Sequence, residues 1–505
     1  MAEAKRRVVV IGAGQLGATF SVLLDRWQQV HDIRPGFEVH LVEKSSQVLM
    51  GATRASWIDH ATGFEYFKRG EFETARACIE GSITKRLLLP KDLHVMPERI
   101  RNRFFVSSES NRSKDVIFDE FYAQARRGAQ MYRSMYEHVV RSLPESDDLL
   151  FKPDDFLGFV ARHEYHGVSG DHVVGGLQSA GGVSNTPMDY AFKIAALERA
   201  VDHGTVVTRC STSVASLVEN DGSVTVVLQR QDGHLESVEA DYVVFTSAHG
   251  ITELVKKVPC ADQRGAYHLN FMLHVRLPPT SDEVLRDDLS SVNFVLQGQN
   301  GGMYACVVPP TAHDEGLAAM FVPGYGASYV DEYATNVHAR PPVAWDQLIE
   351  FAGFPGRLPK IQTVVERIAK LNPFLCEYVD KLDPNEHRVA VGSVFNPHGD
   401  IRSLRRLVAP TQVAPNRRIF TMTSPKWTTS ELAALTLLHH VLLRYDLKPS
   451  LGPIEHGFGP YRIDVATAAR WLRLDGISIN RAVAERYLES LELPKRVLPN
   501  SHPLY

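Results

Sequence analysis

The sequence is poor in cysteine: five occur among 505 residues, widely scattered and never spaced as Cys-x-x-Cys. This argues against a disulfide framework and against a zinc site, and it fits a reducing compartment such as the cytoplasm. Net charge is also small, at −4, so we expect neither nucleic acid nor an anionic membrane surface as a partner. The cysteines are Cys78, Cys210, Cys260, Cys306 and Cys376.

Hydrophobic runs long enough to cross a membrane are missing. The most apolar helix candidate, residues 431–443, is too short and carries two histidines. The basic residues at the N-terminus precede an apolar run that glycines soon interrupt, so we expect a first strand there and no signal peptide. No metal-ligand spacing is present, and we expect no metal site. A chain of 505 residues is too long for one ordinary core, so two or more domains are expected.

The clearest motif is VVVIGAGQLGATF, residues 8–20. Its β-branched run predicts a buried strand, followed by a tight turn and a helix, and residues 37–44 predict a second strand that ends in an acid. In this arrangement the first glycine makes the turn, the second permits close approach of a phosphate, the third permits close helix packing, and the acid contacts an adenosine ribose. The motif therefore predicts a dinucleotide site formed by Gly12, Gly14, Gln15, Leu16, Gly17, Glu43 and Lys44.

Nucleotide-binding α/β patterns return in the middle and near the end of the chain. Between them lie a segment with helical periodicity and a segment in which apolar and polar residues alternate, which predicts an antiparallel sheet. We expect an α/β fold whose dinucleotide-binding domain is discontinuous. The predicted parts are binding segments at 1–70, 166–255 and 386–450, a helical insertion at 71–165, a β-rich substrate domain at 256–385 and a helical tail at 451–505.

This interleaved order resembles the superfamily of FAD-dependent D-amino-acid oxidases and glycerol-3-phosphate dehydrogenases. ADYVVFTSAHG, residues 240–250, resembles its middle strand. PKWTTSELAA, residues 425–434, is similar to the GGKxTTxRxxA motif of the FAD-dependent glycerol-3-phosphate dehydrogenases. The resemblance implies FAD as the cofactor and a Rossmann-like FAD-binding domain built from discontinuous segments, with a β-rich substrate domain and a helical insertion.

In that motif the lysine and the threonines lie by the flavin ring and the phosphates, which implies this role for Lys426, Thr428 and Thr429. A lysine beside a helix N-terminus would stabilise negative charge on a reduced flavin. The alternative is a helix start that is merely well capped. The chain departs from the motif at Ser424 and Pro425, where the family has glycines, and at Glu431, where it has arginine.

A second flavin-loop candidate follows the second strand at residues 51–70. In the superfamily a loop here wraps the pyrophosphate, which implies contacts from Thr53, Arg54 and Ala55. HATGFEYF, residues 60–67, also looks like the HAAG segment of dimethylglycine dehydrogenases, whose histidine is bonded covalently to the flavin. His60 would be the equivalent residue, and covalent attachment, a hydrogen bond near the flavin and a structural role all stay open.

An arginine that binds the carboxylate of an acid substrate is expected from the β-rich domain or just after it. Arg402 is the preferred candidate; a solvated basic loop is the alternative. Arg405, Arg406 and the more distant Arg276 are weaker candidates, and His398 is a candidate base.

The resemblance implies an enzyme, an FAD-dependent oxidase or dehydrogenase. It would transfer a hydride to flavin N5 from a C–H bond next to an amine or hydroxyl of a small amino acid, hydroxy acid or amine. Its partners would be that substrate and an electron acceptor, oxygen or another; a homo-oligomer is left open. The alternatives are a flavin monooxygenase reduced by NAD(P)H and a non-flavin, NAD-binding dehydrogenase of the opine type.

Overall fold

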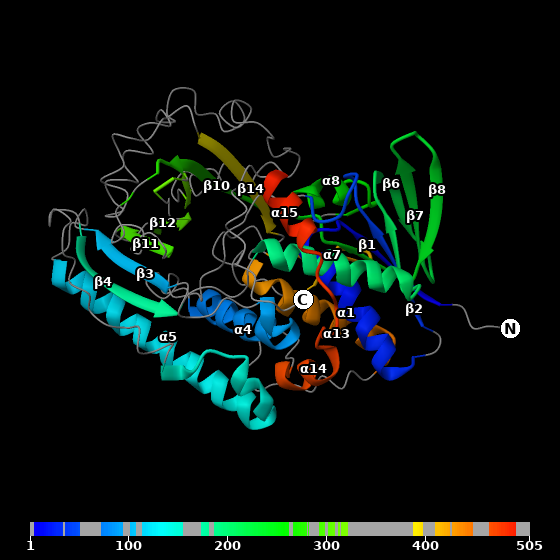
Figure 1. Cartoon of the computed structure of the whole chain (residues 1–505). Coiled ribbons are helices and arrows are strands. Elements are labelled where there is room, and N and C mark those ends of the chain that lie inside the picture. Colours follow the sequence, from blue (N-terminus) through cyan, green and yellow to red (C-terminus); the bar gives the residue numbers. More distant parts are fainter. Residues whose placement is uncertain are drawn as a thin grey trace.

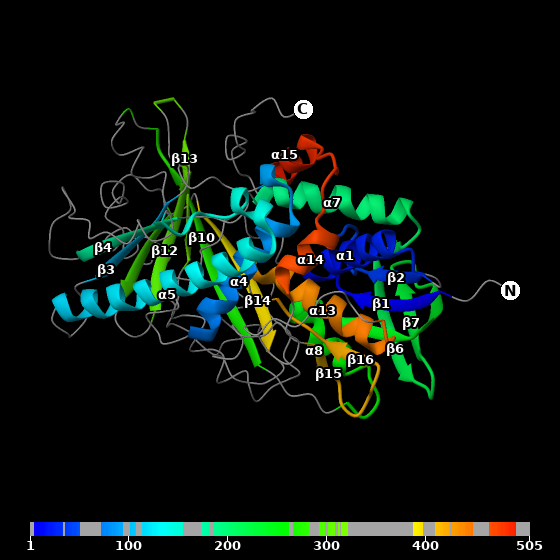
Figure 2. The same cartoon turned by 90° about the horizontal axis from the view of Figure 1, so that it is seen from below.

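The computed structural model describes two large sheets in separate halves of the molecule, with helices around and between them (Figure 1). The view from below shows the two sheets at opposite ends of the molecule (Figure 2). The structure describes residues 5–33, 36–50, 72–93, 101–107, 114–154, 173–180, 186–261, 266–279, 281, 292–297, 301–308, 312–313, 315–321, 387–396, 410–424, 427–447 and 464–490.

The first sheet has the strand order β15-β16-β9-β1-β2-β5, and every pairing in it is parallel except β15 with β16. Its strands are β1 (Arg6–Ile11), β2 (Phe37–Val42), β5 (Val206–Arg209), β9 (Tyr242–Phe245), β15 (Thr411–Gln412) and β16 (Ile419–Thr421). They come from the beginning, the middle and the end of the sequence. The prediction of an α/β fold is thus confirmed.

Both faces of this sheet are covered, which explains why its strands are apolar throughout. Val8 and Val10 of β1 belong to the core shared with the helices, whereas Val9 and Ile11 belong to the core shared with an antiparallel meander. The meander consists of β6 (Thr212–Glu219), β7 (Val224–Arg230) and β8 (Leu235–Ala240). The helical layer is formed mainly by α1 (Gln15–His31), α4 (Phe72–Leu88), α7 (Thr186–Asp202) and α13 (Ser430–Arg444).

Two helices near the end of the chain, α14 (Val465–Leu472) and α15 (Arg481–Ser490), extend the helical layer. The N–H of Leu474 donates to the carbonyl of Leu88 at 2.8 Å, and the rings of Tyr190 and Tyr487 stack with their centroids 4.5 Å apart. The remaining helices are α5 (Lys114–Ser142), α8 (Ile251–Val255) and the 3-10 turns η1 (Lys91–Leu93), η2 (Pro144–Asp148), η3 (Ala248–Gly250) and η5 (Trp427–Thr429).

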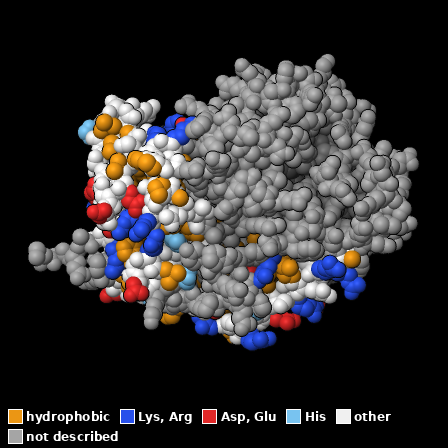
Figure 3. Space-filling model, turned by 180° about the vertical axis from the view of Figure 1, so that it is seen from behind, with side chains coloured by type: hydrophobic (Ala, Val, Ile, Leu, Met, Phe, Trp, Pro, Cys, Tyr) orange, Lys and Arg blue, Asp and Glu red, His pale blue; other side chains and the backbone are white. Residues whose placement is uncertain are grey.

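The described surface carries charges of both signs, which agrees with the small net charge of the sequence (Figure 3). Basic and acidic side chains are interspersed over the described part of the face in Figure 3. Within the residues that the structure describes, no helix has the length and apolar character needed to span a bilayer.

The second sheet has the order β14-β10-β13-β12-β11-β3-β4, and its pairings are antiparallel except that of β3 with β11. The helix α5 lies along its β4 side (Figures 1 and 2). The strands are β3 (Arg101–Ser107), β4 (Val173–Ala180), β10 (Ala266–Leu277), β11 (Val292–Gln297), β12 (Gly301–Val308), β13 (Gly316–Phe321) and β14 (His387–Asn396). The antiparallel strands predicted between residues 266 and 321 are present.

Three of these strands differ from the sequence-based expectation. Strand β3 arises within the segment 71–165, predicted as helical, while β4 and β14 arise within segments predicted to belong to the first sheet. The reason is that their partners are distant in the sequence: β3 pairs with β11 and β14 pairs with β10. Local periodicity carries no information on such pairing.

Candidate functional site

The carboxyl ends of β1, β2, β9 and β16 meet at one edge of the first sheet, because these strands are parallel. In open α/β sheets, ligands bind outside this edge, where the chain connections switch from one side to the other. That point lies between β1 and β9, since α1 leads to β2 on one side while later segments supply β9 and β16 on the other. The glycine turn that follows β1 is therefore at the switch point.

Gly12 makes the turn at the end of β1. Its φ is +111°, a backbone conformation that residues with a side chain rarely adopt. Its N–H donates to the carbonyl of Val42 at 2.8 Å. A Cβ on Gly12 would lie 2.6 Å from the backbone of Ser247, just after β9. Glycine is thus required here both for the turn and for the close approach of the two strand ends.

Gly17 brings the first turn of α1 directly onto the glycine turn. A Cβ on Gly17 would lie 2.2 Å from the carbonyl oxygen of Gly12 and 2.8 Å from the hydroxyl of Thr246. That hydroxyl donates to the Gly12 carbonyl at 2.7 Å. The close helix packing expected of the third glycine is seen in this contact.

The first turn of α1 contains no acidic residue. Gly14 is the N-cap of this helix and is extended, and no side chain caps the helix. The first N–H groups of a helix have no intrahelical partners, and the helix dipole places about half a positive charge there. This end of α1 can therefore bind an anion such as a phosphate. Leu16 and the side chain of Gln15 are buried, and Gln15 accepts a hydrogen bond from Lys193 within the helical layer.

Glu43 follows β2 and lies against the glycine turn. Its two carboxylate oxygens accept one backbone N–H each, from Ala13 at 3.0 Å and from Ser45 at 2.9 Å. Each oxygen has a further lone pair, so the carboxylate can still accept hydrogen bonds from ligand hydroxyls. The neighbouring Lys44 is exposed.

The segment after β16 closes the same edge. The N–H of Met422 donates to the carbonyl of Phe245 at 3.0 Å, which holds this segment beside the end of β9. Thr429 is the N-cap of α13 but makes no side-chain cap hydrogen bond; its hydroxyl lies 3.2 Å from that of Ser424. Helix α4 packs onto η5 so closely that a Cβ on Gly81 would lie 2.5 Å from the carbonyl of Thr428.

Three buried hydroxyl oxygens here lack a hydrogen-bond partner: those of Ser247, Thr423 and Thr428. They come from the segments directly after β9 and β16 and from η5, and the residues Thr423 and Thr428 are only 5% and 1% exposed. Since buried polar atoms almost always have partners, these hydroxyls fit a polar ligand bound at this edge. Of these three residues, only Thr428 belongs to a motif recognisable in the sequence; the signal for the other two is their position just after a predicted strand.

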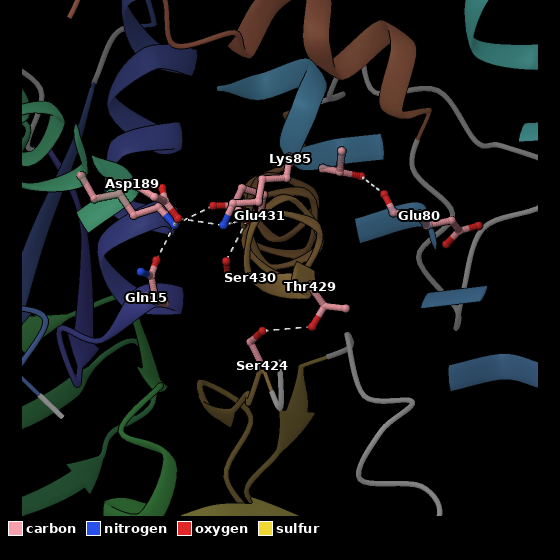
Figure 4. Close-up of polar contacts among 10 residues, drawn as sticks. Gln15, Glu80, Lys85, Asp189, Ser424, Thr429, Ser430 and Glu431 are labelled. Carbon is pink, nitrogen blue, oxygen red and sulfur yellow. Dashed lines mark hydrogen bonds and ion pairs between the residues drawn. The ribbon is translucent and has the colours of Figure 1, made fainter. Parts of the chain in front are cut away.

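A buried cluster of four charged side chains, from α4, α7 and α13, lies next to the N-terminal ends of α1 and α13 (Figure 4). The ammonium of Lys85 lies 2.7 Å from Asp189 and 3.6 Å from Glu431, and that of Lys193 lies 2.6 Å from Glu431 and 3.5 Å from Asp189. All four side chains are at most 3% exposed. Burial favours a neutral Lys193, but the two carboxylates outweigh it and raise the pKa of Lys193, so the amine stays charged.

Glu80 is a further carboxyl beside this region, and it is largely buried. It precedes Gly81, the residue in contact with η5, and its side chain is 12% exposed. Burial raises the pKa of Glu80 to about 8, and the Arg76 guanidinium 3.5 Å away offsets only part of that effect. Neither Glu80 nor the four-charge cluster could be predicted from the sequence, because neither follows from a local pattern.

Part of the predicted site lies outside the described residues. The structure brings together the glycine turn, Glu43, Thr428 and Thr429. Of the side chains that the structure describes, no three or more His, Cys, Asp and Glu lie together as a metal site would require. The predicted residues outside the described side chains are Thr53, Arg54, Ala55, His60, Arg276, His398, Arg402, Arg405, Arg406 and Lys426.

No family model matches the sequence, and no curated protein matches it. Among solved structures, the chain is similar to the L-α-glycerophosphate oxidase of Mycoplasma pneumoniae, solved with FAD bound, with a TM-score of 0.51 at 14% identity over 92% of this chain and 100% of that one. The predicted likeness to FAD-dependent oxidoreductases is thus confirmed at the level of the fold.

Two further structures align at lower TM-scores. The glycerol-3-phosphate dehydrogenase of Bacillus halodurans, complexed with FAD, gives 0.47 at 13% identity over 97% of this chain and 72% of that one. The iminodiacetate oxidase of Chelativorans sp. BNC1 gives 0.49 at 16% identity over 89% of this chain and 98% of that one.

Proposed function

We propose that the chain is an FAD-dependent oxidoreductase that oxidises a C–H bond next to an amine or hydroxyl of a small amino acid, hydroxy acid or amine. The observation that carries the proposal is the uncapped N-terminus of α1 at the switch point of the sheet, in a fold shared with an FAD-containing oxidase. The negative pyrophosphate of FAD matches this helix end, which has no acid in its first turn.

The residues around the edge of the sheet fit the rest of the cofactor. The glycine turn with Gly14 would hold the pyrophosphate, and Glu43 would accept hydrogen bonds from the adenosine ribose. The unpartnered hydroxyls of Ser247, Thr423 and Thr428 would give the cofactor's polar atoms hydrogen bonds that the protein alone leaves unmade.

When bound, FAD supplies a two-electron acceptor for the substrate C–H bond. The chain would supply orientation and charge. From the family resemblance, we assign to Lys426 the stabilisation of negative charge next to the N-terminus of α13, and to Arg402 the binding of a substrate carboxylate. His60 would lie by the flavin, and the test below decides whether it is bonded covalently to the cofactor.

The first experiment is the visible absorption spectrum of the purified protein, followed by acid precipitation. We expect the two visible bands of a flavin, and the position of the colour afterwards decides the attachment. Colour in the supernatant would exclude a covalent link through His60, and colour in the pellet would support it. A colourless protein that neither binds added FAD nor changes its spectrum would refute the proposal and favour the NAD-binding alternative, and rapid bleaching by NADPH would favour a monooxygenase.

A further inference from the structure

The buried cluster behind the site contains a continuous link between two helix N-termini. The ammonium of Lys193 donates to the side-chain carbonyl of Gln15, the first residue of α1, and to the carboxylate of Glu431, the second residue of α13. Figure 4 shows Gln15 and Glu431 converging on this point from their two helices. We call these two contacts, which link Gln15 to Glu431 through Lys193, the bridge.

Stability alone does not account for the bridge. Removing two charged groups from water costs as much as their attraction returns, and well-packed apolar side chains in their place would usually serve stability as well or better. The side chains of Lys193 and Glu431 are 3% and 0% exposed, so this cost applies in full. Buried ionic groups of this kind can instead specify one geometry among several.

The geometry that the bridge specifies concerns the ligand edge. Helix α1 begins directly after the glycine turn that follows β1, and α13 begins directly after η5, which follows β16. Ser430 ties the α13 end in further, because its hydroxyl donates to Glu431 at 2.8 Å. A ligand that touches both helix starts therefore experiences a fixed spacing between them.

We propose that Lys193 and Glu431 are positioning residues that hold the α1 and α13 ends of the cofactor site in register, so that a dinucleotide reaching both ends binds much more tightly than its ADP half. This inference rests on the proposed function, since it takes FAD as the ligand that reaches both ends.

The test compares the affinities of FAD and ADP, measured by fluorescence quenching and calorimetry on the same protein. Lys193→Met breaks the bridge, and Glu431→Gln weakens it by replacing the ion pair with a neutral hydrogen bond. We expect each to reduce the preference for FAD over ADP at least tenfold while changing ADP affinity less than threefold.

A double variant separates positioning from folding. Lys193→Met with Glu431→Gln breaks the bridge but leaves Lys85 and Asp189 as a balanced pair 2.7 Å apart, so it should refold better than either single variant. We expect its FAD preference to stay low. Recovery of the wild-type preference would show that the bridge serves folding only and would overturn the inference.

The matched control removes the other half of the cluster. Lys85→Met with Asp189→Asn deletes an equally buried pair but keeps the bridge, and its FAD preference should equal that of the wild type within threefold; an equal loss would overturn the inference. If the wild-type protein binds no FAD, the proposed function itself fails. If it binds FAD and the bridge variants keep its preference over ADP, only the positioning role fails.

Discussion

Glu80→Gln should stabilise the protein at pH 8 and weaken the pH dependence of its stability. Glu80 lies on α4 with its side chain 12% exposed, and burial raises its pKa from 4.5 to about 8 despite the nearby Arg76. The folded state therefore holds the Glu80 proton more tightly than the unfolded state does. Consequently the free energy of unfolding falls as the pH rises from about 4.5 to about 8 and then levels off.

The size of the effect follows from the pKa difference. A rise from 4.5 to about 8 corresponds to about 5 kcal/mol between the ionised and protonated folded states. About 3 kcal/mol of this is expressed between pH 5 and pH 8, where the unfolded carboxyl is already ionised and the folded one is not. Glutamine cannot ionise, so the variant escapes this loss.

The assay is urea unfolding of the wild type and the variant at pH 5, 6.5 and 8. The stability of Glu80→Gln relative to the wild type should rise by about 3 kcal/mol over this range. Glu485→Gln is the control, because Glu485 also pairs with an arginine four residues away but is 33% exposed; it should follow the wild type. A difference between Glu80→Gln and the wild type that does not change with pH would refute the argument.

Three further outcomes are expected. Gly17→Ala should destabilise the protein by about 3 kcal/mol, because its Cβ would lie 2.2 Å from a carbonyl oxygen, whereas Gly222→Ala, at an open position, should be nearly neutral in the same urea assay. Glu43→Gln should weaken FAD binding about tenfold in a fluorescence titration, because a charged acceptor becomes a neutral one; unchanged affinity would contradict a ribose contact. Lys193→Met should cost about 4 kcal/mol by leaving a buried carboxylate unbalanced, and adding Glu431→Gln should recover part of that loss.

Much of the fold could be predicted because its signals are local. The strand and turn at residues 6–14 follow from a β-branched run and from glycine at position 12, and close packing of α1 follows from Gly17. Each of these signals acts over only a few neighbouring residues. The same is true of β9, α13 and the alternating strands β10 to β13. The strands of the first sheet could also be predicted in three separate parts of the chain, since each part carries an apolar run typical of a buried strand.

The prediction of the site was partial for the same reason. Gly12, Gly17 and Glu43 are recognisable by their spacing from a predicted strand, and in the structure they lie together at the end of β1. Ser247 and Thr423 were missed, because a hydroxyl after a strand becomes informative only when burial leaves it without a partner.

By itself, the sequence determined the elements around the glycine turn and the order in which α/β and β-rich segments follow one another. Tertiary structure alone decided that β3 joins β11 in the second sheet, that Glu80 is shielded from water, and that Lys193 lies between Gln15 and Glu431. The physical reason is that strand pairing, desolvation and ion pairing depend on which distant segments are brought into contact. That information becomes available only when the whole chain has packed.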